Sequence, residues 1–173
     1  MMQRVKYVIF AIVLTIAAVT TSVAAIEAVD KGAIVTAPQN RPAFKREKIF
    51  ILAQDGGRHA MTVEVARKPG ELAYGLMKVK ALPSGSEGML FIMPQTQRQL
   101  FWMKNTHLRL DIIFIGVDGT ITHIYPNAQP YALDFIASPG TAKGVLEIEG
   151  GMAARWGLRA GDRLLHKDFH ALP

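Results

Sequence analysis

The sequence predicts an α+β domain built on a mainly antiparallel, partly closed β-barrel-like sheet of six to seven short strands with two short helices. Short apolar runs rich in β-branched and aromatic residues recur along the chain, as in buried strands. Turn dipeptides such as Asp55-Gly56 and Asp118-Gly119 separate some of these runs at hairpin spacing. A sheet of this size usually curls to protect its edges.

The clearest element is a hairpin near the start of the domain. Residues 49–53 are predicted to form its first strand, and Asp55-Gly56-Gly57 supplies the turn because glycine accepts a positive φ. Residues 59–66 then alternate between apolar and polar side chains, which indicates a half-buried second strand. The expected core residues are Met61, Val63, Val65, Leu90, Ile113, Ile115 and Leu146.

A short helix is predicted after this hairpin. Pro69 fits its first turn, Glu71 lies near the positive end of its dipole, and Gly75 limits it to about two turns. Residues 82–88 are expected to form a loop. A strand over 89–93 is expected to stop at Pro94, followed by a polar connection over 95–99.

The stretch over residues 100–115 predicts a strand, a polar turn and a second strand. Asp118-Gly119 predicts another hairpin turn leading into a strand over 120–125, followed by a long loop over 126–140. A strand over 144–149 and a helix over 152–156 complete the pattern. Gly157 fits a left-handed helix cap, and Gly161-Asp162 fits a tight turn into a last strand.

Residues 1–25 have the organisation of a secretory signal peptide. Two basic residues precede an apolar run, and a segment of small residues leading to Ala25 offers a cleavage site. An uncleaved anchor is the alternative, because residues 7–26 carry no charge and are long enough to span a bilayer. The expected location is periplasmic or secreted, with membrane attachment only through an uncleaved leader. Residues 26–46 are predicted to be a flexible lead-in and 47–170 a single globular domain.

Composition excludes several classes of protein. Hydrophobic residues make up 50% of the chain, which excludes a disordered protein. Without Arg4 and Lys6 of the leader, the formal charge falls from +6 to +4. The sequence contains no cluster of basic and aromatic residues of the kind that would indicate nucleic-acid binding. The absence of cysteine excludes disulfides, thiolate metal sites and a thiol nucleophile.

Five sequence motifs occur in order over roughly residues 49–165. They are Gly75-Leu76-Met77, Gly88-Met89-Leu90-Phe91, Phe101-Trp102-Met103-Lys104-Asn105-Thr106, Leu110-Asp111-Ile112-Ile113-Phe114-Ile115, and Val145-Leu146-Glu147 with the turn over 157–162. Together they resemble the domain-of-unknown-function family 192, and this resemblance implies a fold but no activity. The family usually has a proline just before the Leu110-Asp111 pair, where this chain has Arg109.

The candidate ligand-binding residues lie in and beside the central polar turn. Lys104 offers a cation, Asn105 offers donors and an acceptor, and Trp102 offers a stacking surface if the neighbouring Phe101 is the core residue. Asp111 stands at the start of an apolar strand, where an unpaired carboxylate is costly. The alternative is structural: Asp111 accepts turn amides or pairs with Lys104, and Asn105 holds the turn.

These observations favour a non-catalytic exported domain that binds a small polar or anionic ligand, or an envelope protein, at the Lys104-Asn105-Asp111 turn. No catalytic motif, metal-ligand spacing or cofactor motif is found, so neither a metal nor a cofactor is expected. The alternative is a cell-envelope carbohydrate-active enzyme using paired carboxylates, with Asp111 and either Glu147 or Glu149 as acid and base.

Overall fold

The computed structural model describes residues 40–82 and 87–169. The predicted signal peptide and most of the predicted lead-in lie outside these residues. The elements, in chain order, are β1 (Lys45–Leu52), β2 (Arg58–Ala66), α1 (Pro69–Tyr74), β3 (Glu87–Phe101), β4 (Leu110–Ile115), β5 (Ile121–Ala128), β6 (Ile136–Glu149), α2 (Met152–Arg155) and β7 (Arg163–Leu165).

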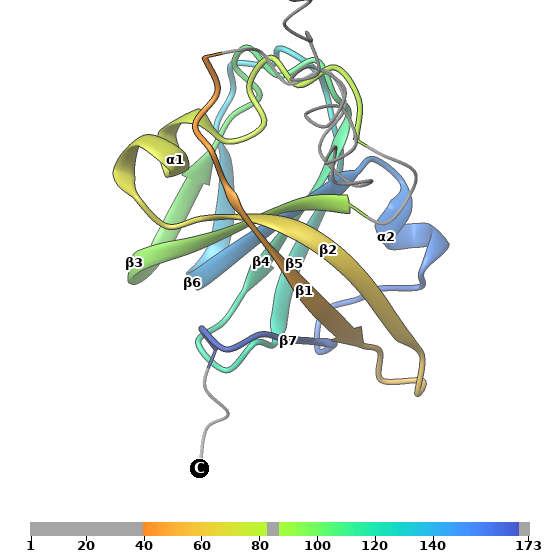
Figure 1. Cartoon of the computed structure of the whole chain (residues 1–173). Coiled ribbons are helices and arrows are strands. Elements are labelled where there is room, and N and C mark those ends of the chain that lie inside the picture. Colours follow the sequence, from red (N-terminus) through yellow and green to blue (C-terminus); the bar gives the residue numbers. More distant parts are fainter. Residues whose placement is uncertain (1–39, 83–86, 170–173) are drawn as a thin grey trace, which may run out of the picture. The chain divides into compact units, whose positions relative to one another are not determined.

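The seven strands form one curled sheet in the order β5-β4-β6-β3-β2-β1-β7 (Figure 1). The α+β class, the number of strands and the two short helices are therefore as predicted. The hairpin turns at Asp55-Gly56-Gly57 and Asp118-Gly119 are confirmed, since each joins two antiparallel strands. Although Leu110–Ile115 follows the polar turn as expected, β4 does not pair with β3, because β6 lies between them.

The sheet is mixed rather than antiparallel throughout. Five of its six strand pairings are antiparallel, but β2 and β3 pair in parallel. Two parallel neighbours need a crossover connection, and here the chain between them includes α1. The sequence analysis predicted this helix and a mainly antiparallel sheet, but it did not predict the parallel pairing that the helix connects.

The sheet curls into an open half-barrel, whereas the sequence predicted a partly closed barrel-like sheet. At one end, a single bridge pairs Thr120 with Arg163 and brings the two edge regions together. The Ile121 amide donates to the Asp162 carbonyl at 2.7 Å, and the Leu164 amide donates to the Gly119 carbonyl at 2.8 Å. These contacts satisfy backbone groups at this end of both edge strands.

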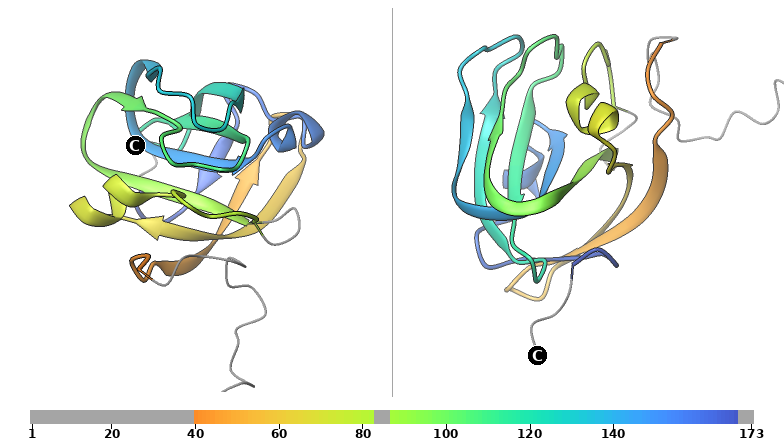
Figure 2. Two further views of the ribbon diagram at one scale, coloured as in Figure 1. Left: turned by 90° about the horizontal axis from the view of Figure 1, so that it is seen from above. Right: turned by 90° about the vertical axis from the view of Figure 1, so that its left-hand side faces the viewer.

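Two strands are much longer than predicted. β3 has 15 residues and continues through Pro94 and the polar segment over 95–99, while β6 has 14 residues and begins inside the predicted loop over 126–140. Pro94 lies within a register shift between Ile92 and Gln97, where its missing N–H costs no ladder bond. Figure 2 shows the strong bend of β3. Both predictions were wrong because an exposed polar strand lacks the apolar signal of a buried one.

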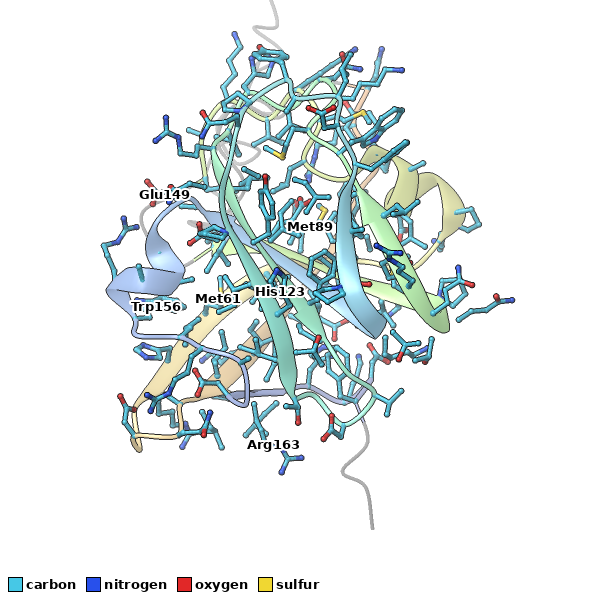
Figure 3. The ribbon with its side chains drawn as sticks, turned by 180° about the vertical axis from the view of Figure 1, so that it is seen from behind. Met61, Met89, His123, Glu149, Trp156 and Arg163 are labelled. Carbon is cyan, nitrogen blue, oxygen red and sulfur yellow. The ribbon has the colours of Figure 1, made fainter. Side chains whose placement is uncertain are left out.

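Hydrophobic residues fill both faces of the sheet. One cluster lies on the α2 side and includes all seven predicted core residues. The second cluster lies on the other face, so that along β3 Leu90 belongs to the first cluster and its neighbours Met89 and Phe91 belong to the second. Figure 3 shows Met61 and Trp156 near each other on the α2 side. The second cluster includes Leu76 and Val79 from the segment that follows α1. Within the described ranges, no helix is long and apolar enough to cross a membrane.

Candidate ligand-binding pocket

A small pocket opens on the α1 side of the sheet. Its volume is about 50 Å³, and its walls come from α1 with the following turn, from β3 and the turn after it, and from the last residues of β6. Figure 1 shows α1 beside the end of β3. The lining residues are 72–77, Phe91, Phe101, Trp102, Lys104, Thr106 and Glu147.

The apolar wall depends on close packing between the end of α1 and β3. The helix ends at Gly75, whose φ of +53° is poorly accessible to other residues. A Cβ at this position would lie 3.1 Å from the Phe91 ring. Phe91 in turn packs edge-to-face with Phe101, with ring centroids 5.1 Å apart. The pocket is therefore bounded by a rigid aromatic wall.

The turn that follows β3 forms the mouth of the pocket. Asn105 adopts a left-handed conformation with φ of +57°, and its carbonyl accepts the Lys78 amide at 2.8 Å. Asn105 therefore fixes the turn against the segment after α1. Its side-chain nitrogen lies 4.0 Å from the sulfur of Met77, which lines the pocket.

Trp102 and Lys104 stand together at this mouth. Trp102 is 39% exposed and stacks on Phe135, with ring centroids 5.7 Å apart. The Lys104 ammonium lies 4.9 Å from the Trp102 ring centroid, within range of a cation–π contact. Phe101 packs against the second hydrophobic cluster, whereas Trp102 is partly exposed, and both residues line the pocket.

Glu147 is the acidic group of the pocket and comes from β6, an inner strand of the sheet. It pairs with Met89 on one side and Ile112 on the other, so its side chain projects among fully buried apolar neighbours. Glu147 is only 5% exposed, and among the described residues its carboxyl has neither a hydrogen bond nor an ion pair. Burial raises the pKa of Glu147 to about 8. The carboxyl is therefore mostly protonated at neutral pH.

Asp111 lies apart from this pocket. Its carboxylate accepts the Asn127 and Gly151 amides at 2.8 and 3.0 Å, and the Ala153 amide at 2.8 Å. These bonds fix the start of α2 and the end of β5, so Asp111 has the structural role that the sequence left open. No ion pair joins it to Lys104 in the part of the chain that the structure describes.

The structure thus brings Trp102, Lys104 and the backbone of Asn105 to one mouth, leaves Asp111 out, and adds Glu147. Sequence reasoning considered Glu147 only as an enzymatic acid. The available signal was a carboxylate inside an otherwise apolar strand, which is costly without a role. Within residues 40–82 and 87–169, no group of three or more histidine, aspartate or glutamate residues is arranged to hold a metal ion.

The fold and pocket define a class of protein: a small α+β half-barrel with a pocket beside a crossover helix. The chain belongs to the DUF192 family, described as Uncharacterized ACR, whose profile matches residues 50–166. A comparison with curated proteins finds no match.

Two solved structures are similar to the chain over most of their length. One is a candidate transcription regulator from Sinorhizobium meliloti 1021, with 37% identity and a TM-score of 0.70, covering 72% of this chain and 95% of that one. The other is a protein of unknown function from Novosphingobium aromaticivorans DSM 12444. It has 36% identity and a TM-score of 0.69, covering 75% of this chain and 91% of that one.

Four of the five motifs that carry the family resemblance supply residues to the pocket. They contribute the turn after α1, Phe91, the mouth residues Trp102 and Lys104, and Glu147. These motifs are far apart in the sequence. Glu147 lies beside the β3 motif because β6 pairs with β3, where Met89 is opposite Glu147. The pocket is therefore where the family-like segments converge.

Proposed function

We propose that this domain is exported and binds a small polar ligand, or a polar group of an envelope partner, in the pocket that contains Glu147. The observation that carries the proposal is the buried Glu147 carboxyl, which lines a pocket and has no partner among the described residues. Convergence of perturbed ionisable groups with a concave surface is typical of functional sites.

Energetics support a functional role for this carboxyl. Burial disfavours the ionised form of Glu147 and raises its pKa to about 8, whereas an apolar side chain of similar size would pack without such a cost. A carboxyl held in such surroundings beside a pocket is consistent with selection for binding rather than for stability.

The mouth supports the same proposal. Lys104 and Trp102 present a charge and an aromatic surface from a turn whose backbone is held by the Asn105 carbonyl. A rigid frame with exposed functional groups loses little entropy when a ligand binds. Asn105 contributes by shaping the turn, and Asp111 by securing the neighbouring helix.

A thermal-shift screen with sugars, nucleotides and cell-envelope fragments tests the binding proposal. A ligand present at 100 times its Kd stabilises the folded state by about 2.7 kcal/mol. We expect this stabilisation to disappear in the Glu147→Gln variant. A ligand that stabilises both proteins equally would place the binding site elsewhere.

Export is supported by the order of basic, apolar and small residues in the leader. Mass spectrometry of the protein from its native host should find an N-terminus near Ala25 in an extracytoplasmic fraction. An intact Met1 in the cytoplasmic fraction would contradict export.

A further inference from the structure

We infer that the group bound in this pocket is a primary ammonium, paired with the Glu147 carboxylate beside the rings of Phe91 and Phe101. The inference rests on the binding function proposed above and adds the chemical class of the ligand. A peptide N-terminus, a lysine side chain and an amino sugar share this group.

The polarity of the lining indicates a cation. Glu147 is the acid of the lining and is only 5% exposed, whereas the pocket's lysine, Lys104, is exposed and lies over the Trp102 ring. The Thr106 hydroxyl already donates to the Lys104 carbonyl at 3.3 Å. The buried part of the lining therefore offers a carboxyl and aromatic rings, and both attract a positive charge that brings its own hydrogen-bond donors.

Hydrogen bonding indicates a primary rather than a quaternary ammonium. A primary ammonium carries three N–H groups that can donate to the Glu147 carboxylate. A trimethylammonium group is larger and has no N–H to donate.

Protonation gives the inference a measurable consequence. In the empty pocket, Glu147 has a pKa of about 8 and carries a proton at pH 7. An entering ammonium pairs with the carboxylate, so one proton leaves the Glu147 carboxyl for solvent and the bound pair is neutral overall. Affinity should therefore rise about tenfold per pH unit below pH 8, and level off above it.

Calorimetry of n-butylammonium binding to the purified chain at pH 6, 7 and 8 tests this predicted pH dependence of the affinity. We expect the affinity to rise with pH and nearly one proton to be released at pH 6. Tetramethylammonium, n-butyrate and 1-butanol should bind at least tenfold more weakly at pH 8. Glycinamide, Nα-acetyl-lysine amide and glucosamine then distinguish the three sources of the ammonium by their relative affinities.

Two variants provide matched controls. Glu147→Gln should lower the n-butylammonium affinity at pH 8 at least tenfold, abolish the pH dependence and leave the melting temperature unchanged or higher. Glu149→Gln should leave binding unchanged, because Glu149 lies two residues along β6, outside the pocket lining, and pairs with Arg155 at 3.3 Å. Figure 3 shows Glu149 near α2.

The outcomes separate the inference from the proposed function. Glu147-dependent binding of butyrate or butanol without butylammonium overturns the ammonium inference and leaves a binding pocket in place. Binding of a screened ligand other than an amine through Glu147 would likewise overturn the ammonium inference and leave a binding pocket in place. Failure of every probe and every screened ligand overturns both.

A third result would identify an internal occupant. If Lys104 itself enters the pocket in solution, the Glu147 carboxyl carbon would titrate near its usual range by NMR. The Lys104→Met variant would then raise that pKa. This result overturns the inference, because the chain would supply its own ammonium.

Discussion

The carboxyl groups of Asp111 and Glu147 are buried on opposite faces of the sheet, although the two residues lie on paired strands. In the β4–β6 register, Asp111 pairs with Ile148, and Glu147 pairs with Ile112. Successive side chains on a strand alternate between faces, so this offset of one residue separates the two groups. Asp111 meets the start of α2, whereas Glu147 lines the pocket near α1.

This arrangement gives no support to the paired-carboxylate enzyme. Acid and base must face one cleft, about 5–10 Å apart, to act on one glycosidic bond. Glu149 does not supply the missing partner, because it is exposed and paired with Arg155. Among the described residues that line the pocket, Glu147 is the one acid. The placement of these carboxylates therefore gives the proposed binding function more support than this enzymatic alternative.

The first prediction concerns Asp111. Replacing it with alanine removes the acceptor of three backbone amides, which would be left without this partner. We expect the free energy of unfolding to fall by about 3–5 kcal/mol. Urea unfolding measures this value. Asp55→Ala is the control, because the Asp55 carboxylate accepts one amide in an exposed turn and should cost about 1 kcal/mol or less.

The second prediction is a fall in stability with rising pH due to Glu147. Its pKa is raised from 4.5 to about 8 in the folded state, so between these values the folded protein holds a proton that the unfolded chain has lost. The contribution of this group to stability is therefore complete below pH 4.5 and is lost as pH rises through 8. Between these values the free energy of unfolding should fall by up to about 1.4 kcal/mol per pH unit. Urea unfolding from pH 5 to 8 should show this slope, and Glu147→Gln should remove it. Equal slopes in both proteins would mean that Glu147 titrates normally.

The third prediction has the opposite sign and concerns Glu47. Burial alone would raise its pKa, but hydrogen bonds from Arg67, Lys167 and His166 lower it to about 2. The unfolded chain therefore binds a proton at Glu47 more readily than the folded protein does. The stabilising contribution of the ionised Glu47 is present above pH 4.5 and is lost as pH falls toward 2. Acid unfolding of Glu47→Gln should be less steep over this range. An unchanged acid transition would show that this cluster does not stabilise the protein.

Much of the local structure was predictable, whereas the order of strands was not. Alternation in 59–66 and the Asp-Gly turns gave the hairpins, because these signals are local. The insertion of β6 between β3 and β4 depends on contacts between distant segments, which no local pattern encodes. The sequence therefore identified Trp102 and Lys104 in one turn, but could not bring Glu147 to them or move Asp111 to the other face.

The fourth prediction separates folding from binding at Lys104. Its side chain is exposed, and its described contact is the Trp102 ring, so Lys104→Ala should change stability by no more than about 0.5 kcal/mol. Removing a positive charge from the mouth should raise n-butylammonium affinity about two- to fivefold at low salt. Calorimetry and thermal melting measure the two effects. Early melting with unchanged affinity would assign Lys104 a structural role only.

The last prediction concerns Gly75, where backbone conformation and pocket shape meet. Gly75→Ala introduces a Cβ at a φ of +53° and 3.1 Å from the Phe91 ring, so both the backbone and the aromatic wall must adjust. We expect a loss of about 1–3 kcal/mol in the free energy of unfolding, with weaker binding of any ligand that contacts Phe91. Gly70→Ala is the matched control in α1, because its added Cβ meets nothing within 4 Å. That variant should be neutral or stabilising by up to about 1 kcal/mol. If the two variants melt together, the close packing of the α1 end on β3 is not what shapes the pocket.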